Sequence, residues 1–488
     1  MDAIETIESQ IAYYLSGNQL YSEYKDHWQY LLESYVGSEE YTNANHLLKY
    51  NLETAGEYAA RLKTTPLQNH CNSIIGVYTS FIFKQSPVRD LGVLANNPMI
   101  DEVLKDADMD GRSFNQFMKD VSVYSSIFGH SWVIVTKPDV GAITMADEIS
   151  AGVRPYVNIV TPLMVLDWQW KRQPTGAYEL CYFKYIEEIN GDVKTIKVWT
   201  PETVKTVIVD DRAVTLETTE EVNGLGEIPA VCAYNKRGII RGIGVSDIGD
   251  IANQQRYIYN LSSEIEQTIR LDSHPSVVAT PNTILTAGAG SIIQVPEDLD
   301  PGLKPYILQS SGANIANILQ TMQDSVNAID KMANTGAIRA TEAKTMSGIA
   351  MQTEFMMLAA RLAEKADALE LSEEHIWRWI YKYMGVQYDA TIDYPHAYNI
   401  RDNSTDLDFL IKARSSGVND PVFQAEINKQ IVELVVEDSN LINDIHNAMA
   451  EQSFETHTMT NPRTGETVTV TSQAQHLELT ARGFVHDG

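Results

Sequence analysis

Cysteine is scarce in this sequence, and its scarcity excludes two kinds of architecture. The chain has three cysteines in 488 residues, and Cys71, Cys181 and Cys232 lie far apart. An odd number of widely spaced cysteines argues against a disulfide framework and against a zinc site. The sequence therefore predicts a protein that assembles in a reducing cytoplasm and has no structural metal.

Long apolar runs are also lacking. No run approaches the roughly 20 residues that a helix needs to span a bilayer. The first residues, MDAIETIE, are acidic and amphipathic, whereas a signal peptide has a basic start and an apolar centre. We therefore expect no membrane partner.

Positive charge is in short supply as well. Lys and Arg number 37 against 65 Asp and Glu, which gives a net charge of −28 at pH 7. A protein that grips DNA is usually basic, because neutralising phosphates supplies most of the non-specific affinity. The acidic balance fits an ordinary soluble protein, and it also fits a channel wall that repels phosphate and lets DNA slide.

Signatures of catalysis are missing too. The sequence has no phosphate-binding Walker A loop and no His-Glu-x-x-His motif. The run GAGSII at 288–293 lacks the third glycine of a dinucleotide fingerprint, and GVSDI at 244–248 has isoleucine where a nucleophile elbow needs glycine. Histidines such as His70, His130, His375 and His446 stand alone. We expect no enzyme activity, no cofactor and no metal, although the many Asp and Glu residues leave a nuclease-like carboxylate cluster open.

The sequence does contain one unusually long helical pattern, at residues 347–383. Its apolar residues recur in steps of three, four and seven, which is the helical period. Ser347 is a candidate N-cap, Gly385 follows the last periodic residue, and no proline interrupts the pattern. At 1.5 Å per residue the helix is roughly 50 Å long. Leu362 and Trp379 belong to the apolar stripe, so we expect both to face a core.

Two shorter helical patterns precede the long one, at residues 247–271 and 313–332. Pro275 ends the first, because proline cannot continue a helix. A strand-prone block rich in Gly and Pro separates the two, at 276–309, and a loop of small residues at 333–346 leads into the long helix. An insert of this size cannot bury a core alone, so we expect it to pack on neighbouring copies or on its own chain.

The flanking regions complete an α+β pattern. Residues 113–128 predict a helix that Gly129 ends, and from 131 to 233 the apolar period changes to two, as in an antiparallel sheet. A second helical region, at 406–449, is interrupted at 417–421. The polar residues 456–488 predict either a hairpin or a disordered tail.

The order helix, β insert, helix, loop and long helix resembles the portal, or head-to-tail connector, proteins of tailed bacteriophages. The resemblance covers roughly residues 45–450, and it lies in GVSDI at 244–248, HP at 274–275, SGIAMQ at 347–352, FGHSWVIV at 128–135 and RPYV at 154–157. It implies a portal-type fold with an α/β wing, a two-helix stem, a small β clip, a long wing helix and a helical C-terminal crown. The regions are 1–245 (N-terminal helices and wing), 246–273 (first stem helix), 274–311 (clip), 312–333 (second stem helix), 334–346 (tunnel loop), 347–388 (long wing helix), 389–455 (crown) and 456–488 (tail).

The resemblance also implies two sets of functional residues. The tunnel loop would face DNA through Arg339, Thr341, Glu342 and Lys344. Its two cations would become two rings of positive charge that touch phosphates without reading sequence. The clip would join subunits and dock the motor and the adaptor through Val277, Ile284, Leu285, Ile292, Ile293, Glu297 and Asp298.

The implied function is a dodecameric ring at one capsid vertex, through which double-stranded DNA is packaged and ejected. The implied partners are further copies of the chain, DNA, the terminase motor, a neck or tail adaptor, and the major capsid and scaffold proteins. The protein would be assembled in the host cytoplasm and located in the virion. The alternative is an acidic cytosolic enzyme with nuclease-like carboxylate chemistry; a ring with a central hole supports the first hypothesis, and a compact monomer or dimer supports the second.

Overall fold

The computed structural model separates the chain into two compact units, Met1–Tyr398 and Asn399–Gly488. The structure describes residues 6–138, 151–210, 212–273, 276–278, 280, 300, 302, 305–308, 313–339, 348–396, 398, 403–416, 420–436, 442, 445–446, 448–449, 457–461, 467–470, 479–480, 482 and 484–486. Helices and strands are mixed in both units.

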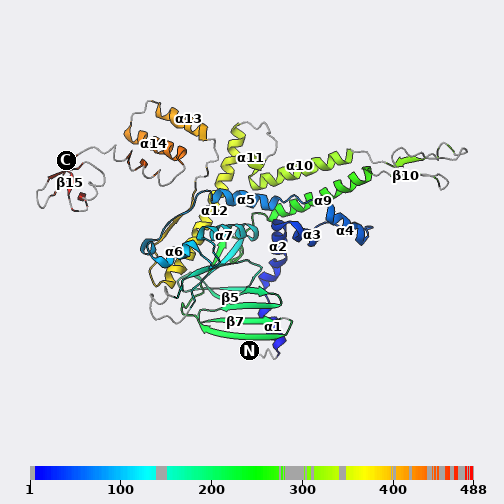
Figure 1. Ribbon diagram of the computed structural model, residues 1–488, viewed down its shortest axis with the longest axis horizontal. Helices are drawn as coiled ribbons and strands as arrows, with labels where there is room; N and C mark the ends of the chain where they lie inside the picture. Colours follow the sequence, from blue (N-terminus) through cyan, green and yellow to red (C-terminus); the bar gives the residue numbers. More distant parts are fainter. Residues whose placement is uncertain are drawn as a thin grey trace. The chain divides into compact units, whose positions relative to one another are not determined.

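The first unit begins with a series of helices (Figure 1). They are α1 (Ile7–Leu15), α2 (Gln19–Val36), α3 (Ser38–Asn43), α4 (Ala55–Thr64), α5 (His70–Ile82), α6 (Pro98–Lys105) and α7 (Phe114–Phe128), with a 3-10 turn, η1, at Gly92–Leu94. Of these, α1, α2 and α7 pack against the sheets, and α4 lies along α9 (Gly249–Ser273). The bounds of α7 confirm the sequence prediction. Ser113 Oγ accepts a hydrogen bond from the Gln116 backbone N–H at 3.3 Å, and Gly129 ends the helix at φ +89°, a conformation that favours glycine.

Two antiparallel sheets follow α7. One has three strands in the order β3-β2-β9, and the other has five in the order β4-β5-β6-β7-β8. The strands are β2 (His130–Thr136), β3 (Tyr156–Val160), β4 (Val165–Arg172), β5 (Tyr178–Asn190), β6 (Val193–Trp199), β7 (Thr203–Asp210), β8 (Thr215–Val222) and β9 (Ala230–Tyr234). A small ladder pairs β1 (Val88–Asp90) with β12 (Thr391–Asp393), so the chain just beyond residue 389 belongs to the first unit.

Aromatic side chains join the two sheets. Trp132 on β2 is fully buried, and its ring centroid lies 4.8 Å from that of Phe183 on β5 and 6.2 Å from that of Trp170 on β4. Each large ring buries far more apolar area than an aliphatic side chain. This aromatic layer holds the five-stranded sheet against the body of the unit.

The long helix α12 (Gly348–Tyr383) crosses the first unit, as its apolar period predicts. Leu362 is fully buried, which confirms that part of the prediction. The prediction for Trp379 is wrong, because Trp379 is only partly buried and Trp377 is the residue in the core. Trp377 stacks on Phe114 of α7 with centroids 4.9 Å apart, and this contact decides which of the two tryptophans faces inward.

Three further helices and a ladder complete the first unit. α9 (Gly249–Ser273) and α10 (Ala313–Ala333) occupy nearly the predicted positions. Between them, β10 (Ser276–Val278) pairs antiparallel with β11 (Tyr306–Leu308). A short helix, α11 (Gly336–Arg339), follows α10.

The second unit contains two helices and a small sheet. α13 (Asn403–Arg414) and α14 (Pro421–Val435) lie on either side of the predicted interruption. Asp420 caps α14, because its Oδ1 accepts from the Phe423 backbone N–H at 2.9 Å. The strands β13 (His457–Thr460) and β14 (Thr467–Val470) pair antiparallel, as the predicted hairpin requires, and β15 (Val485–His486) pairs with β13.

No described helix is both long enough and apolar enough to cross a bilayer. Cys71, Cys181 and Cys232 are all free thiols.

Candidate functional site

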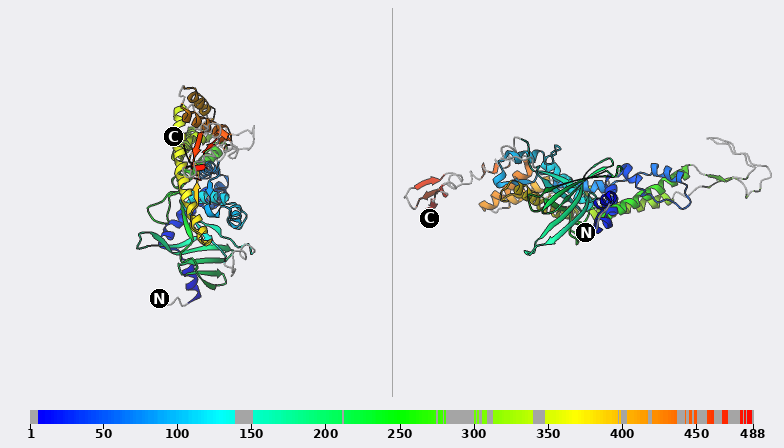
Figure 2. Two further views of the ribbon diagram at one scale, coloured as in Figure 1. Left: turned by 90° about the vertical axis from the view of Figure 1, so that its left-hand side faces the viewer. Right: turned by 90° about the horizontal axis from the view of Figure 1, so that it is seen from below.

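The helices α9 and α10 leave the sheets together as an antiparallel pair. Figure 1 shows them side by side with β10 beyond their ends, and the second view in Figure 2 agrees. α9 runs outward from Gly249, and α10 returns to Ala333. The pair therefore carries the small β10–β11 ladder away from the rest of the first unit.

Burial falls along this pair from its root, where it meets α5, α7 and α12, to its far end at β10. At the root, Ile248, Ile329 and Ala333 are fully buried. Toward the far end, Ile269 is 43 % exposed and Leu319 is 52 % exposed. A single chain thus covers the apolar residues of the root and leaves those of the far end uncovered.

A buried carboxylate fixes the root at the start of α9. Asp247 accepts hydrogen bonds from Lys365 Nζ at 2.6 Å and from Arg361 Nη2 at 3.2 Å, and both cations lie on α12. Lys365 also donates to Ser126 Oγ on α7 at 2.9 Å. Burial by itself would raise the pKa of Asp247, but the two cations outweigh burial and hold the pKa below its ordinary value. Asp247 is therefore ionised at neutral pH and joins α7, α9 and α12.

The returning end of α10 is held by the same group of side chains. Arg361 Nη1 donates to the Met332 carbonyl at 2.9 Å, and Tyr78 Oη on α5 donates to the Ala333 carbonyl at 2.5 Å. The last carbonyls of a helix have no partner within the helix. These two bonds satisfy them, so both helices of the pair are anchored in one polar network.

A second buried cation holds the middle of α9. Arg61 on α4 donates to Ser263 Oγ at 3.0 Å and to both carboxylate oxygens of Glu53 at 2.8 Å. Its guanidinium lies 4.0 Å from the ring centroid of Tyr50, whose hydroxyl donates to Glu264 of α9 at 2.5 Å. The N-terminal helices therefore support α9 for about two-thirds of its length, as far as Glu264.

The predicted tunnel loop begins with a helix, which corrects the sequence prediction for this stretch. Arg339 is the last residue of α11, and its side chain is 13 % exposed. Its Nη1 donates to Asp330 Oδ1 at 2.7 Å, and its Nη2 donates to His70 Nδ1 at 2.6 Å. A four-residue helix is not stable alone, so these tertiary partners determine its conformation.

His70 takes part in this contact as a neutral ring. Burial lowers the pKa of His70 to about 4, and the charge of Arg339 acts in the same direction. The ring is uncharged at neutral pH, which allows Nδ1 to accept from Arg339. His70 therefore has a structural role at the root.

The other predicted site residues fall into two groups. Val277 lies in β10 and pairs in register with Ile307 of β11. The remaining residues lie outside the part of the chain that the structure describes: Ile284, Leu285, Ile292, Ile293, Glu297, Asp298, Thr341, Glu342 and Lys344.

The charge of the helix pair is mildly negative. α9 carries the acidic residues Asp250, Glu264, Glu266 and Asp272 and the basic residues Arg256 and Arg270, whereas α10 carries Asp324, Asp330 and Lys331. Tight binding to DNA needs several cations facing the phosphates. The described part of the pair therefore lacks the charge of a surface that grips DNA.

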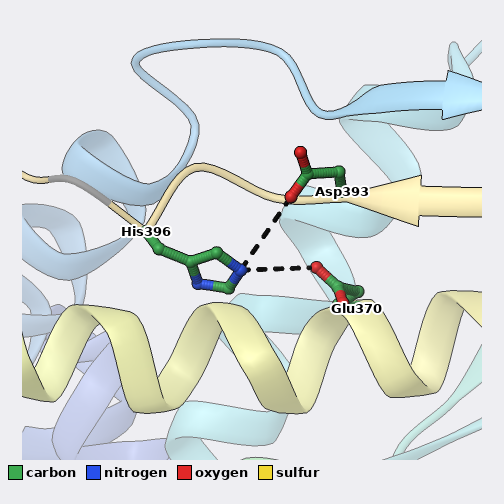
Figure 3. A group of neighbouring side chains, drawn as sticks. All are labelled: Glu370, Asp393 and His396. Atoms are coloured by element: carbon green, nitrogen blue, oxygen red, sulfur yellow. Dashed lines mark ion pairs between the residues drawn. The ribbon is translucent and has the colours of Figure 1, made fainter.

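One group among the described residues combines side chains that metal ions use. Glu370 on α12, Asp393 in β12 and His396 just after β12 lie around a common point (Figure 3), with one ligand atom of each within 4.8 Å of the others. His396 Nε2 lies 3.6 Å from Glu370 and 3.9 Å from Asp393, and its Nδ1 lies 3.3 Å from Asp367. The His396 side chain is 44 % exposed. Exposed acidic side chains around a histidine are common without a metal, so this cluster alone does not indicate a metal site.

No protein-family model matches the chain, and no curated protein matches it. Solved structures that it resembles include a chain in the neck of an empty gene transfer agent (GTA) particle, computed with C6 symmetry. That match has a TM-score of 0.46 and 9 % identity, and it covers 83 % of this chain and 100 % of that chain. A chain in the virion of a native gene transfer agent particle matches with a TM-score of 0.43 and 9 % identity, covering 73 % of this chain and 89 % of that one. Both likenesses are distant.

Proposed function

We propose that this chain is a ring-forming portal protein of a phage-like particle, in which α9 and α10 are the stem and β10 and β11 belong to the clip. The observation that carries the proposal is the contrast along the α9–α10 pair, which is anchored at its root and uncovered at its far end. The order of elements along the chain, from which the resemblance to portal proteins comes, supports the same assignment.

The exposed apolar side chains at the far end are consistent with a contact to a neighbouring copy of the chain. Ile269 and Leu319 lie toward the far end of the pair and Tyr306 lies in the ladder beyond it, and the three are exposed at 43 %, 52 % and 57 %. A two-stranded ladder is marginal without partners. In a ring, each copy offers the next the same surfaces, and head-to-tail contacts close when the rotation permits.

The charge of the pair fits a passive channel. The described residues of α9 and α10 carry more acidic than basic side chains, which keeps phosphate contacts weak enough for DNA to slide. Hydrolysis of ATP would belong to a separate terminase motor, since this chain has no Walker A loop. The ring would dock that motor first and a neck or tail adaptor later.

The segment after α11 is the proposed DNA contact. Arg339 is engaged by Asp330, so we assign the larger share of any phosphate contact to Lys344. In assembled particles, Lys344→Ala should lower the length or the retention of packaged DNA, and Arg339→Ala should act mainly on stability. If rings of Lys344→Ala package the same length of DNA as the wild type and retain it equally well, Lys344 does not contact DNA in the channel.

The experiment that tests the ring is native mass spectrometry of the purified full chain. We expect one closed oligomer with a single subunit number. A monomer or dimer at every concentration tested, with the chain folded, would overturn the proposal.

The alternative function, a nuclease-like enzyme, has a specific candidate in Glu370, Asp393 and His396. Incubation with plasmid DNA and Mg²⁺ or Mn²⁺ tests it, with the double variant Glu370→Gln, Asp393→Asn as the control. Cleavage that this variant abolishes would favour the enzyme, and no cleavage by the wild type would favour the channel.

A further inference from the structure

A groove lies along the face of α12 that points away from α7. Its volume is about 730 Å³, and it extends between α12, the residues around the end of β9, and the turn that joins β4 to β5. The opposite face of α12 is buried, where Trp377 stacks on Phe114 of α7. The groove therefore belongs to the outer surface of the first unit.

The lining of the groove combines aromatic rings with cations. The Arg241 guanidinium lies 4.0 Å from the ring centroid of Tyr178 and 5.5 Å from that of Trp170, and Lys382 Nζ lies 5.1 Å from the ring of Trp379. Ile239 stands fully exposed beside Arg241. Exposed apolar residues among aromatic rings are typical of protein interfaces.

The groove is also basic in a chain that is strongly acidic overall. Arg237 and Arg241 line it, and neither pairs with a carboxylate among the residues that the structure describes. Lys236 and Lys382 line it too, each paired with one glutamate. With a net charge of −28, a second copy of the chain presents mainly acidic surface to these arginines.

The turn between α6 and α7 presents one exposed acidic side chain, Asp110, whereas Asp106 and Asp108 in the same turn are paired with Arg154 and Arg112. The turn at 106–111, with the sequence DADMDG, joins α6 to α7, and Met109 stands at its tip, 44 % exposed. Met109 has φ +62°, a backbone conformation that is unfavourable for a bulky residue and that persists only where the surroundings enforce it.

The surroundings of Met109 do enforce its conformation. Asp106 Oδ1 accepts from the Gly111 backbone N–H at 2.9 Å, and Asp108 Oδ1 accepts from the Asp110 backbone N–H at 3.0 Å. Arg154 donates to Asp106 Oδ2 at 2.9 Å. The turn is therefore rigid, and it presents an exposed methionine next to the exposed carboxylate of Asp110.

We propose that the groove receives the α6–α7 turn of a neighbouring copy, with Met109 against the aromatic rings and Asp110 facing Arg241. This proposal rests on the ring proposed above, because a ring of identical chains joins two different surfaces of each copy. The first view in Figure 2 shows α12 (yellow) on one side of the first unit and α6 and α7 (blue to cyan) on the other. The two surfaces therefore face in the directions that a head-to-tail contact requires.

Cross-linking between copies tests the contact. One preparation carries Met109→Cys and the other Ile239→Cys, both in a Cys181→Ser, Cys232→Ala background that removes the two partly exposed thiols, of which Cys232 lines the groove. The two are mixed as unfolded chains, refolded and assembled together, and treated with a bis-maleimide. We expect a covalent dimer from the mixture and none from either preparation alone. Val222→Cys, 83 % exposed and outside the groove, replaces Ile239→Cys in the matched control, which should give no dimer.

The outcomes separate this inference from the proposed function. Rings without cross-links would overturn the contact and leave the portal proposal intact, whereas failure of the unmodified chain to form rings would count against the portal proposal itself. DNA is the competing occupant of a basic groove. The thiol introduced by Ile239→Cys should be shielded from alkylation in rings without DNA, and shielding that appears only after duplex DNA is added would overturn the assignment to a second copy.

Discussion

At the root of the α9–α10 pair, Asp247, Lys365 and Arg361 are enclosed and hydrogen-bonded, whereas at the far end Leu319 and Tyr306 stand exposed. In the first region, a single chain buries and pairs these side chains by itself. The second has apolar residues and a two-stranded ladder but nothing within the described chain that covers them. For the ring proposed above, this difference predicts that folding and assembly depend on separate parts of the same helices, so substitutions should affect them separately.

The largest effect on folding is expected at the buried carboxylate. Asp247→Ala leaves Lys365 buried without its anion, and breaking a buried ion pair in this way costs about 3–5 kcal/mol. The measurement is the free energy of unfolding from urea denaturation. Asp250→Ala, an exposed acidic residue one turn further along α9, is the matched control and should change it by less than about 0.5 kcal/mol. Equal effects of the two substitutions would mean that the root is not a special anchor.

A similar or slightly smaller loss is expected in the core beneath the root. Leu362 on α12 is fully buried, so Leu362→Ala should lower the free energy of unfolding by about 2–5 kcal/mol. Leu371 lies on the same helix at 54 % exposure, and Leu371→Ala should be nearly silent. A silent Leu362→Ala would place that face of α12 in solvent.

The root should also give stability a pH dependence through His70. Its pKa is lowered to about 4 in the folded chain, so between pH 6.5 and pH 4 the unfolded chain binds a proton that the folded chain does not. The neutral ring of His70 contributes its full stabilisation above pH 6.5. As the pH falls toward 4, this contribution to the free energy of unfolding is lost at up to about 1.4 kcal/mol per pH unit. His70→Asn keeps an acceptor for Arg339 and removes the titration, so its unfolding free energy should fall less steeply over this range. If the unfolding free energies of wild type and variant fall in parallel as the pH is lowered, His70 does not have the lowered pKa assigned to it.

The smallest effect on folding is expected at the far end. Leu319→Ala should change the unfolding free energy of the single chain by no more than about 0.5 kcal/mol, because Leu319 is 52 % exposed. It should nevertheless weaken the ring, as seen by dilution in native mass spectrometry. Leu48→Ala, 71 % exposed and outside the α9–α10 pair, should leave the ring intact. A ring that is indifferent to Leu319→Ala would show that the far end is not an interface between copies.

The sequence predicts the positions of the helices better than it predicts the buried charged side chains that hold them together. Strict apolar periods locate α7, α9, α10 and α12 to within a few residues. The same period cannot choose between Trp377 and Trp379, because the two lie on opposite flanks of the apolar stripe, about 200° apart around the helix, and a contact with Phe114 decides. Lys365 and Arg61 are missed because charged residues are expected at the surface unless a partner is known. That partner is distant in sequence for Lys365, whereas Glu53 lies only two residues before the helix that carries Arg61.

The tunnel-loop prediction illustrates the same limit at a functional residue. Small residues and two cations indicate a mobile basic loop, whereas Asp330 and His70 hold Arg339 in a helical turn. His70 comes from a helix far earlier in the chain, so no local pattern could reveal the contact.

Electron microscopy of the purified chain is the most direct test of ring formation. We expect ring-shaped particles in end views, each with a central hole wide enough for duplex DNA, and rings that Leu319→Ala destabilises. A field of compact monomers or dimers, or closed particles without a hole, would contradict the proposed ring.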